Sequence, residues 1–206
     1  MDNLYSYNNI TYNIEIKRKK GCRSIYFRLS PNSNVVRVSA PYYVSNEKIV
    51  ESTIKRIPLL VENAKKMGEM DDLESHYFLG EKKDDVVDLS ILKDECLDIL
   101  NKKVSYYSSL MGISRTYKVK IRDMKTRLGT NSRRTYSLDF ASILFRFPLE
   151  VMDSIIIHEL AHHFEFNHSK KFYDVVYKYM DEPTYKYYLY LIRKRKYDRS
   201  YLLERK

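Results

Sequence analysis

The sequence contains no tryptophan, only two cysteines and no long apolar run. Cys22 and Cys96 lie far apart without paired spacing, which argues against a disulfide framework and favours two reduced thiols. No apolar run approaches the roughly 20 residues needed to span a bilayer. The first ten residues also lack the basic and apolar regions of a secretory signal. We therefore expect a soluble, cytoplasmic protein without membrane contact.

Tyrosine takes the place of the missing tryptophan. The chain has 20 tyrosines. Of its 206 residues, 44% are hydrophobic, which is enough for a sizeable core with tyrosine hydroxyls at its edge. No internal repeat, low-complexity linker or clear domain boundary is present. The composition therefore predicts one domain over residues 1–206.

The first third of the chain alternates as β-strands do. Apolar residues of one parity recur over 12–16, 25–29 and 36–38, with turn residues between these runs. We predict an antiparallel β-segment within about 10–45. Ser45 is a plausible N-cap for a helix over 46–56, and Pro58 begins a further helical piece.

The second half is mixed, which makes the predicted fold class α+β: the N-terminal β-segment packed with a helical core over about 89–182. Helices are expected at 89–111, at 149–166 after Pro148, and from Ser169 to about 180. Strands are expected at 117–121, 136–138 and 143–147. A basic helix over 184–206 ends the chain.

Four of the five histidines fall within HELAHHFEFNH at 158–168. On an α-helix the four-residue step from His158 to His162 is about 40° of rotation and about 6 Å of rise, so both imidazoles point the same way. With Glu159 beside them they form the H-E-x-x-H pattern of two Zn²⁺ ligands and a catalytic base. His163 lies about 100° away from that stripe.

A third zinc ligand is needed, and two residues compete for the role. Glu165 returns to the ligand stripe within about 20° if the helix continues, whereas His168 would then point away. His168 becomes a ligand only if the helix ends first, at a break over 166–168 where Asn167 can adopt the left-handed conformation. We favour His168 because Ser169 independently signals a new helix.

Three protein ligands leave the fourth zinc position to water, whose pKa falls to around 7. Glu159 can accept the proton of that water as it attacks a carbonyl or phosphoryl group. Arg127, His163 and several tyrosines are candidates to contact the substrate or the developing oxyanion. The pattern predicts a zinc-dependent hydrolase.

HELAHHFEFNHSKKFY at 158–173, preceded by MKTRLGTN at 124–131, resembles the YgjP-like metallopeptidase domain family, which is related to the SprT and WLM zinc proteases. That family pairs its zinc motif with an SRWGSC-like segment. The similarity extends over roughly residues 15–180, and Arg127 matches the arginine of the segment. Leu128, Thr130 and Asn131 depart from its Trp, Ser and Cys.

The resemblance implies a zincin-like metallopeptidase domain in which His158, His162 and His168 bind zinc and Glu159 is catalytic. The substrate is then a peptide or protein. The same family suggests an alternative, nucleoside triphosphate (UTP) pyrophosphohydrolase activity. A third hypothesis is a non-catalytic, zinc-stabilised binding module.

Basic residues outnumber acidic ones, which gives a net charge of +10, and many of them lie in KRKKGCR at 17–23 and at 192–206. Such runs are usually solvated. They also predict phosphate binding, since clustered cations release counterions from nucleic acid. Tyr185, Tyr187, Tyr188 and Tyr190 could stack on bases, although tyrosines in a helix more often pack. DNA or RNA association stays a minority hypothesis.

Overall fold

The computed structural model describes residues 3–124 and 126–203, and its contacts divide the chain into two compact units, residues 1–73 and 74–206. Each unit has a hydrophobic core of its own, so each is described by itself. That residues 1–206 act as one domain stays a prediction.

The first unit is built on a four-stranded sheet of β1 (Leu4–Tyr7), β2 (Ile10–Arg18), β3 (Tyr26–Arg28) and β4 (Val35–Ala40) in the order β1-β2-β4-β3. The three predicted strands are confirmed as β2, β3 and β4. The sheet differs from the expected antiparallel one because its central pair, β2 and β4, is parallel. The chain leaving β2 crosses to the outer edge, and β3 then pairs antiparallel with β4.

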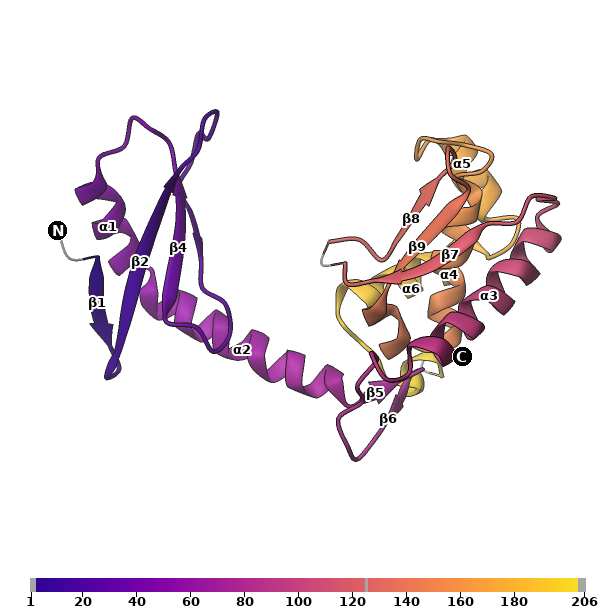
Figure 1. Ribbon diagram of the computed structural model, residues 1–206, viewed down its shortest axis with the longest axis horizontal. Helices are drawn as coiled ribbons and strands as arrows, with labels where there is room; N and C mark the ends of the chain where they lie inside the picture. Colours follow the sequence, from indigo (N-terminus) through magenta and orange to yellow (C-terminus); the bar gives the residue numbers. More distant parts are fainter. Residues whose placement is uncertain (1–2, 125, 204–206) are drawn as a thin grey trace. The chain divides into compact units, whose positions relative to one another are not determined.

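Alternation along these strands gives the sheet one apolar face and one exposed face. Tyr12 and Ile14 of β2 and Val36 and Val38 of β4 are buried in the core of the unit. Helices α1 (Asn46–Ile54) and α2 (Ile57–Ser75) cover that face (Figure 1). Ser45 caps α1 as predicted, with its Oγ accepting a hydrogen bond from the Lys48 amide at 3.3 Å.

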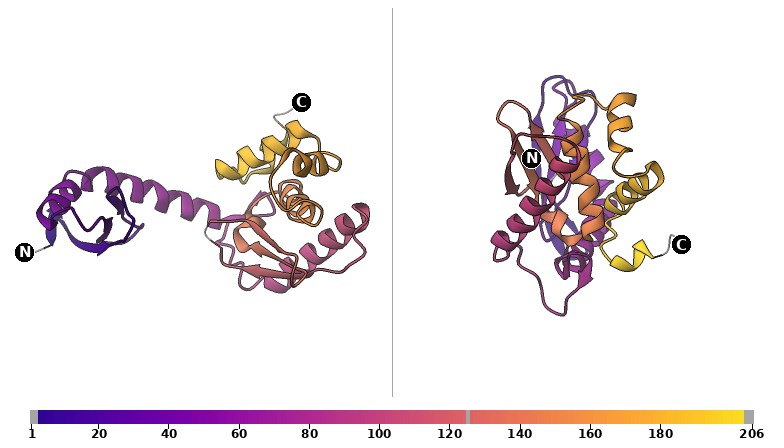
Figure 2. Two further views of the ribbon diagram at one scale, coloured as in Figure 1. Left: turned by 90° about the horizontal axis from the view of Figure 1, so that it is seen from above. Right: turned by 90° about the vertical axis from the view of Figure 1, so that its right-hand side faces the viewer.

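The second unit places helices around a three-stranded sheet of order β7-β9-β8, in which β7 is parallel and β8 antiparallel to β9. Helix α4 is central, since it contacts α3, α5, α6 and β8 (Figures 1 and 2). The elements are β5 (Tyr77–Phe78), β6 (Glu81–Lys82), α3 (Lys93–Leu110), β7 (Lys118–Arg122), β8 (Gly129–Ser132), β9 (Ser137–Ala141), η1 (Ser142–Arg146), α4 (Leu149–Ala161), α5 (Lys170–Val176), α6 (Glu182–Arg193) and η2 (Arg199–Leu202).

The α+β class is confirmed, but three predicted elements need correction. Residues 143–147 form the 3₁₀ helix η1 and Phe147 after it, because the adjacent Leu144 and Phe145 are both fully buried, which an alternating strand does not allow. Helix α4 ends at Ala161 instead of 166. The basic helix expected over 184–206 ends at Arg193, and residues 204–206 lie outside the described residues. No helix in the described parts of the chain is both long and apolar enough to cross a membrane.

Arg146 ties the start of the second unit to the segment that precedes α4. Its guanidinium donates hydrogen bonds to the backbone oxygens of Ser75 and Tyr77, both at 2.9 Å, and of Val87, at 2.8 Å. The side chain is half-buried, and burial lowers the pKa of the guanidinium, so these bonds offset a desolvation cost. The residue that ends η1 therefore organises two separate stretches of backbone, around 75–77 and at Val87.

We expect Arg146→Met to lower the free energy of unfolding by about 3 kcal/mol, because it leaves several carbonyls without a donor. Arg146→Lys should recover only part of this loss, since an ammonium cannot match the planar fork. Urea denaturation measures both values. The exposed Arg134→Met serves as control and should stay within about 0.5 kcal/mol of the unmodified protein. Equal effects at the two positions would contradict the assignment.

Candidate metal centre

The C-terminal end of α4 carries the first two histidines of the motif, His158 within the helix and His162 as its C-cap. Residues 155–157 lie in the core, and Glu159 is only 6% exposed. His158 and His162 are one turn apart, with ring centroids separated by 5.1 Å. Both belong to the lining of a single cleft. The helical spacing therefore acts as the sequence predicts.

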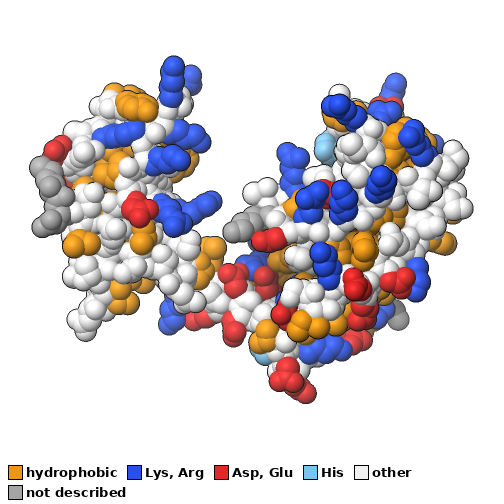
Figure 3. Space-filling view, in the orientation of Figure 1, with side chains coloured by type: hydrophobic (Ala, Val, Ile, Leu, Met, Phe, Trp, Pro, Cys, Tyr) orange, Lys and Arg blue, Asp and Glu red, His pale blue; other side chains and the backbone are white. Residues whose placement is uncertain are grey.

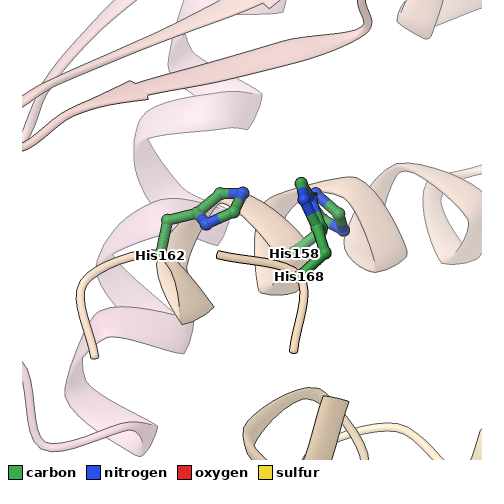
Figure 4. Close-up of side chains that lie close together, drawn as sticks. All are labelled: His158, His162 and His168. Atoms are coloured by element: carbon green, nitrogen blue, oxygen red, sulfur yellow. Dashed lines mark hydrogen bonds between the residues drawn. The ribbon is translucent and has the colours of Figure 1, made fainter. Parts of the chain in front are cut away.

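His168 reaches these two histidines because the helix stops. The amides of His163 and Phe164 bond three residues back, to Leu160 at 2.9 Å and Ala161 at 3.0 Å, which tightens the end of α4. The chain then turns before α5. His168 lies between these elements, with its ring centroid 4.9 Å from that of His158 and 4.8 Å from that of His162 (Figure 4).

The break differs in detail from the predicted one. It begins after Ala161, earlier than the expected 166–168, and Asn167 is not among the residues with positive φ. A tightened last turn, and not a left-handed asparagine, ends the helix. The outcome for His168 is nevertheless the expected approach: one ligand atom from each of His158, His162 and His168 lies within 4.8 Å of the others.

Two neighbours fix the orientation of the imidazoles. The Nδ1 of His158 lies 2.6 Å from the hydroxyl of Tyr185, and the Nδ1 of His162 lies 3.2 Å from the backbone oxygen of Glu165. The Nε2 atoms of His158 and His168 are 3.0 Å apart. Glu165 thus takes part through its carbonyl, while the described three-residue cluster does not include its carboxylate.

Burial controls the charges in the cluster. It lowers the pKa of His158 to about 3, with smaller contributions from His162 and His168, so this imidazole is neutral at neutral pH. Burial also raises the pKa of Glu159 to about 7, opposed by the positive charge of Arg127. The charge of a bound divalent ion would favour the ionised form of Glu159.

Strand β8 packs against α4 so closely that only glycine fits at its first position. A Cβ added to Gly129 would lie 2.6 Å from both Cγ and Oε1 of Glu159. Real Cβ atoms do not come this near, so any larger residue at 129 would displace the glutamate. The Glu159 side chain therefore keeps its position because residue 129 is a glycine and has no Cβ.

The same strand completes the end of the helix. The carbonyl of Glu159 would bond to the amide of His163 in a continuing helix, but that amide bonds to Leu160. Asn131 takes the vacated place, with its Nδ2 donating to the Glu159 oxygen at 2.6 Å. Asn131 therefore caps α4 from a neighbouring strand.

The remaining two candidates occupy different places. His163 is absent from the cleft lining, and its Nδ1 lies 3.0 Å from the hydroxyl of Tyr117, which Asn131 also approaches at 3.4 Å. Arg127 is exposed and does line the cleft, as does Arg133. The structure thus places Arg127 in the same cleft as the three histidines. His163 lies outside the cleft lining and contacts Tyr117 instead.

The cleft at the histidines has a volume of about 620 Å³. Besides the residues named above, aromatic and aliphatic side chains line it: Ile155, Phe166, Tyr173, Tyr185 and Leu189. Tyr185 is fully buried, so it cannot stack on bases as considered from the sequence, and its contact with His158 is long-range and gives no local signal. Gly129 likewise carries no local signal of its contact with Glu159, although it lies within the segment 124–131 that resembles the family.

The donor set fits a divalent metal ion. Three imidazoles converge, and the Nδ1 contacts of His158 and His162 leave their Nε2 atoms available. The low pKa of His158 keeps it deprotonated, as a metal ligand must be. An all-histidine triad with a buried glutamate beside it is the arrangement of a hydrolytic metal centre.

Comparison with known families agrees with this class of site. The profile of the YgjP-like metallopeptidase domain matches residues 82–188, slightly more than half of the chain and all of the histidine cluster. The chain belongs to the YgjP-like metallopeptidase domain family. Membership implies a metal ion and supports a metallopeptidase, and His158, His162 and His168 could hold that ion.

No curated protein matches the chain. Among solved structures it is similar to two metallopeptidase zymogens, abylysin of Pyrococcus abyssi and jannalysin of Methanocaldococcus jannaschii, at 24% identity and a TM-score of 0.44 for each. The matches cover 47% of this chain and 94% of abylysin, and 48% and 96% for jannalysin. A similarity this low says nothing about the activity or the substrate of this chain.

The fit between Gly129 and Glu159 can be measured as a coupling energy. We expect Gly129→Ala to lower the free energy of unfolding by about 2 kcal/mol, because the added methyl group overlaps Glu159. In a Glu159→Ala background the same change should cost at least about 1 kcal/mol less. Urea denaturation of the four proteins gives the cycle. Thr130→Ala is the control and should show no coupling to Glu159; coupling below about 0.3 kcal/mol for Gly129 would reject the contact.

Proposed function

We propose that this chain is a zinc-dependent peptidase in which His158, His162 and His168 hold the ion and Glu159 is the general base. The convergence of three imidazole nitrogens within 4.8 Å, one residue from a buried glutamate, is the observation that carries the proposal. Zinc is the metal that three histidines with an open fourth position favour. When bound, it supplies Lewis-acid chemistry: it acidifies water and polarises a carbonyl.

The chain's own residues hold and move the proton. Glu159 is placed by Gly129 and faces the same cleft as the histidines, so its carboxylate can accept a proton from the attacking water. The same group can then deliver that proton to the departing amine nitrogen. The hydroxyl of Tyr185 lies at the Nδ1 of His158, which orients the imidazole and leaves its Nε2 for the ion.

A peptide substrate is supported by the wall of the cleft. Residues 128–131 line it, and β8 is an edge strand of its sheet. An edge strand offers backbone donors and acceptors with which an extended peptide can pair. Apolar neighbours such as Phe166 and Leu189 offer contact to peptide side chains.

A second candidate, nucleoside triphosphate pyrophosphohydrolase action, draws support from one observation. Arg127 and Arg133 line the cleft, and no ion pair of either is recorded among the described residues, so both are available to a phosphate. The third hypothesis, a non-catalytic zinc-stabilised module, predicts metal without turnover. The two experiments below separate the three functions.

Metal content is the direct test of the ligand set. We expect about one zinc ion per chain by plasma mass spectrometry after mild purification. His162→Ala and His168→Ala should each retain less than about a tenth of it, since two imidazoles bind zinc weakly. The adjacent His163→Ala and the nearby Glu165→Gln are matched controls that should keep the metal. Metal loss from Glu165→Gln with retention in His168→Ala would reverse the ligand assignment.

Activity on casein and on UTP, assayed side by side, tests the chemistry. We expect zinc-dependent cleavage of casein, reduced by about 10²–10⁴-fold in Glu159→Gln because the general base is lost. That variant should keep its metal, which separates catalysis from binding. Turnover of UTP alone would support the nucleotide candidate, and no turnover of either by a zinc-loaded protein would support the binding module.

A further inference from the structure

Unit 1 lies outside residues 82–188, and nothing so far assigns it a role. Its sheet has one face covered by α1 and α2 and one face open. The open face and the loop after β2 border a hollow of about 830 Å³. Its lining includes five cationic residues and no acidic one: Lys19, Lys20, Arg23, Arg28 and Arg37. Figure 3 shows Lys and Arg side chains gathered along one side of this unit.

Most of these cations have no partner within the chain. No hydrogen bond or ion pair of the side chains of Lys19, Lys20, Arg23 or Arg28 is recorded among the described residues, and all four are exposed. Arg37 pairs with Glu15 at 3.7 Å, both side chains being more than half exposed. By contrast, Arg18 in the same run is bonded to the oxygens of Pro41 and Val44, each at 2.6 Å.

The strand register adds a second observation. Arg28 of β3 and Arg37 of β4 are direct partners in the antiparallel ladder. Like charges directly opposite each other destabilise a sheet. Glu15 lies opposite Arg37 on the other side, which relieves only one of the two arginines. A negatively charged ligand over this pair would remove the repulsion.

Exposed aromatic rings flank the cations. Tyr26 is 63% exposed and lines the hollow, directly opposite Ser39 in the ladder. Tyr43 is 77% exposed, and its hydroxyl donates to the backbone oxygen of Arg23 at 3.1 Å, which holds it beside the loop. Rings on an open sheet face are platforms on which unpaired bases stack, while neighbouring cations contact the phosphates.

The other basic stretch lacks these properties. Arg195 is bonded to Glu74, Lys196 to the hydroxyl of Tyr201 at 3.2 Å, and Arg199 to Glu150 at 2.6 Å. Two of these three cations, Arg195 and Arg199, are therefore paired with a carboxylate within unit 2. Arg193 and Lys194 of this stretch are also exposed, but the cations at 17–23 differ in lining one hollow together with an exposed ring.

We propose that the open face of the unit 1 sheet, formed by the cations of the hollow and Tyr26, with Tyr43 beside the adjoining loop, binds single-stranded nucleic acid. An acidic protein would satisfy the cations but gives the exposed rings no planar partner. A duplex keeps its bases stacked inside, so it would leave the rings unused. The combination of free cations and rings therefore favours an unpaired strand, whether DNA or RNA.

Fluorescence anisotropy on the full chain tests this surface with fluorescein-labelled dT15 and U15 at about 50 and 200 mM salt. We expect dissociation constants of about 1–100 μM at the lower salt, and weaker binding at the higher. The triple variant Lys20→Gln, Arg23→Gln, Arg28→Gln should bind at least about tenfold more weakly. Its salt slope should fall by about 2, because each lost phosphate contact removes about 0.7.

A control of equal charge separates this face from general attraction. The triple variant Lys48→Gln, Lys55→Gln, Lys65→Gln removes three cations of the same unit, from α1, its C-cap and α2. It should weaken binding less than about threefold with little change in slope. Equal losses in the two triple variants, or no binding of either oligonucleotide at 50 mM salt, would overturn the proposal.

The aromatic contribution has its own variant. Tyr26→Leu should weaken binding by about fivefold to tenfold with an unchanged salt slope, because a base loses its stacking partner but no phosphate contact is lost. Tyr106→Leu in unit 2, where the ring is 62% exposed, is the matched control and should have no effect. An unchanged affinity in Tyr26→Leu, together with equal displacement of dT15 by polyglutamate, would indicate an acidic protein partner and reject nucleic acid.

Discussion

The site in unit 2 depends on one close approach, that of strand β8 to helix α4. Gly129 brings backbone to within contact of the Glu159 side chain, where a Cβ would lie 2.6 Å away. Two residues further on, Asn131 donates to the Glu159 carbonyl at 2.6 Å. A helix end leaves carbonyls without partners, and a buried one must find a donor. Because the strand supplies it, α4 can stop at Ala161, and the turn after it can carry His168 back to His158 and His162.

Local geometry explains why so much of the histidine cluster can be predicted from the sequence. The relation between His158 and His162 follows from 3.6 residues per turn and needs no tertiary information. The apolar residues before them predict a buried helix, which α4 is. His168 is different, since its place depends on where the helix stops. Ser169 signals a new helix and so indicates a break, but the i→i+3 bonds that end α4 carry no residue signature comparable to a glycine.

Contacts made across the fold could not be predicted in the same way. The sequence of β8, GTNS, has no apolar alternation, so only its pairing with β9 makes it a strand. Tyr185 lies 27 residues from His158, and no local rule connects the two. Residues 143–147 are apolar enough for a strand, yet Leu144 and Phe145 enter the core side by side. In each of these cases tertiary packing, and not propensity, decides the structure.

The net charge of +10 shows the same limit from another direction, because it sums cations in unlike surroundings. The guanidinium groups of Arg18 and Arg146 donate hydrogen bonds to backbone oxygens inside their own units. Lys19 and Lys20 follow Arg18 directly in the sequence, yet no partner of theirs is recorded among the described residues. The orientation of each of these neighbouring side chains depends on its place in the strand or the loop, and the pairing of the sheet fixes that place. The charge available to a ligand therefore depends on which basic side chains are exposed on one surface. The number of basic residues in a sequence run overstates that charge.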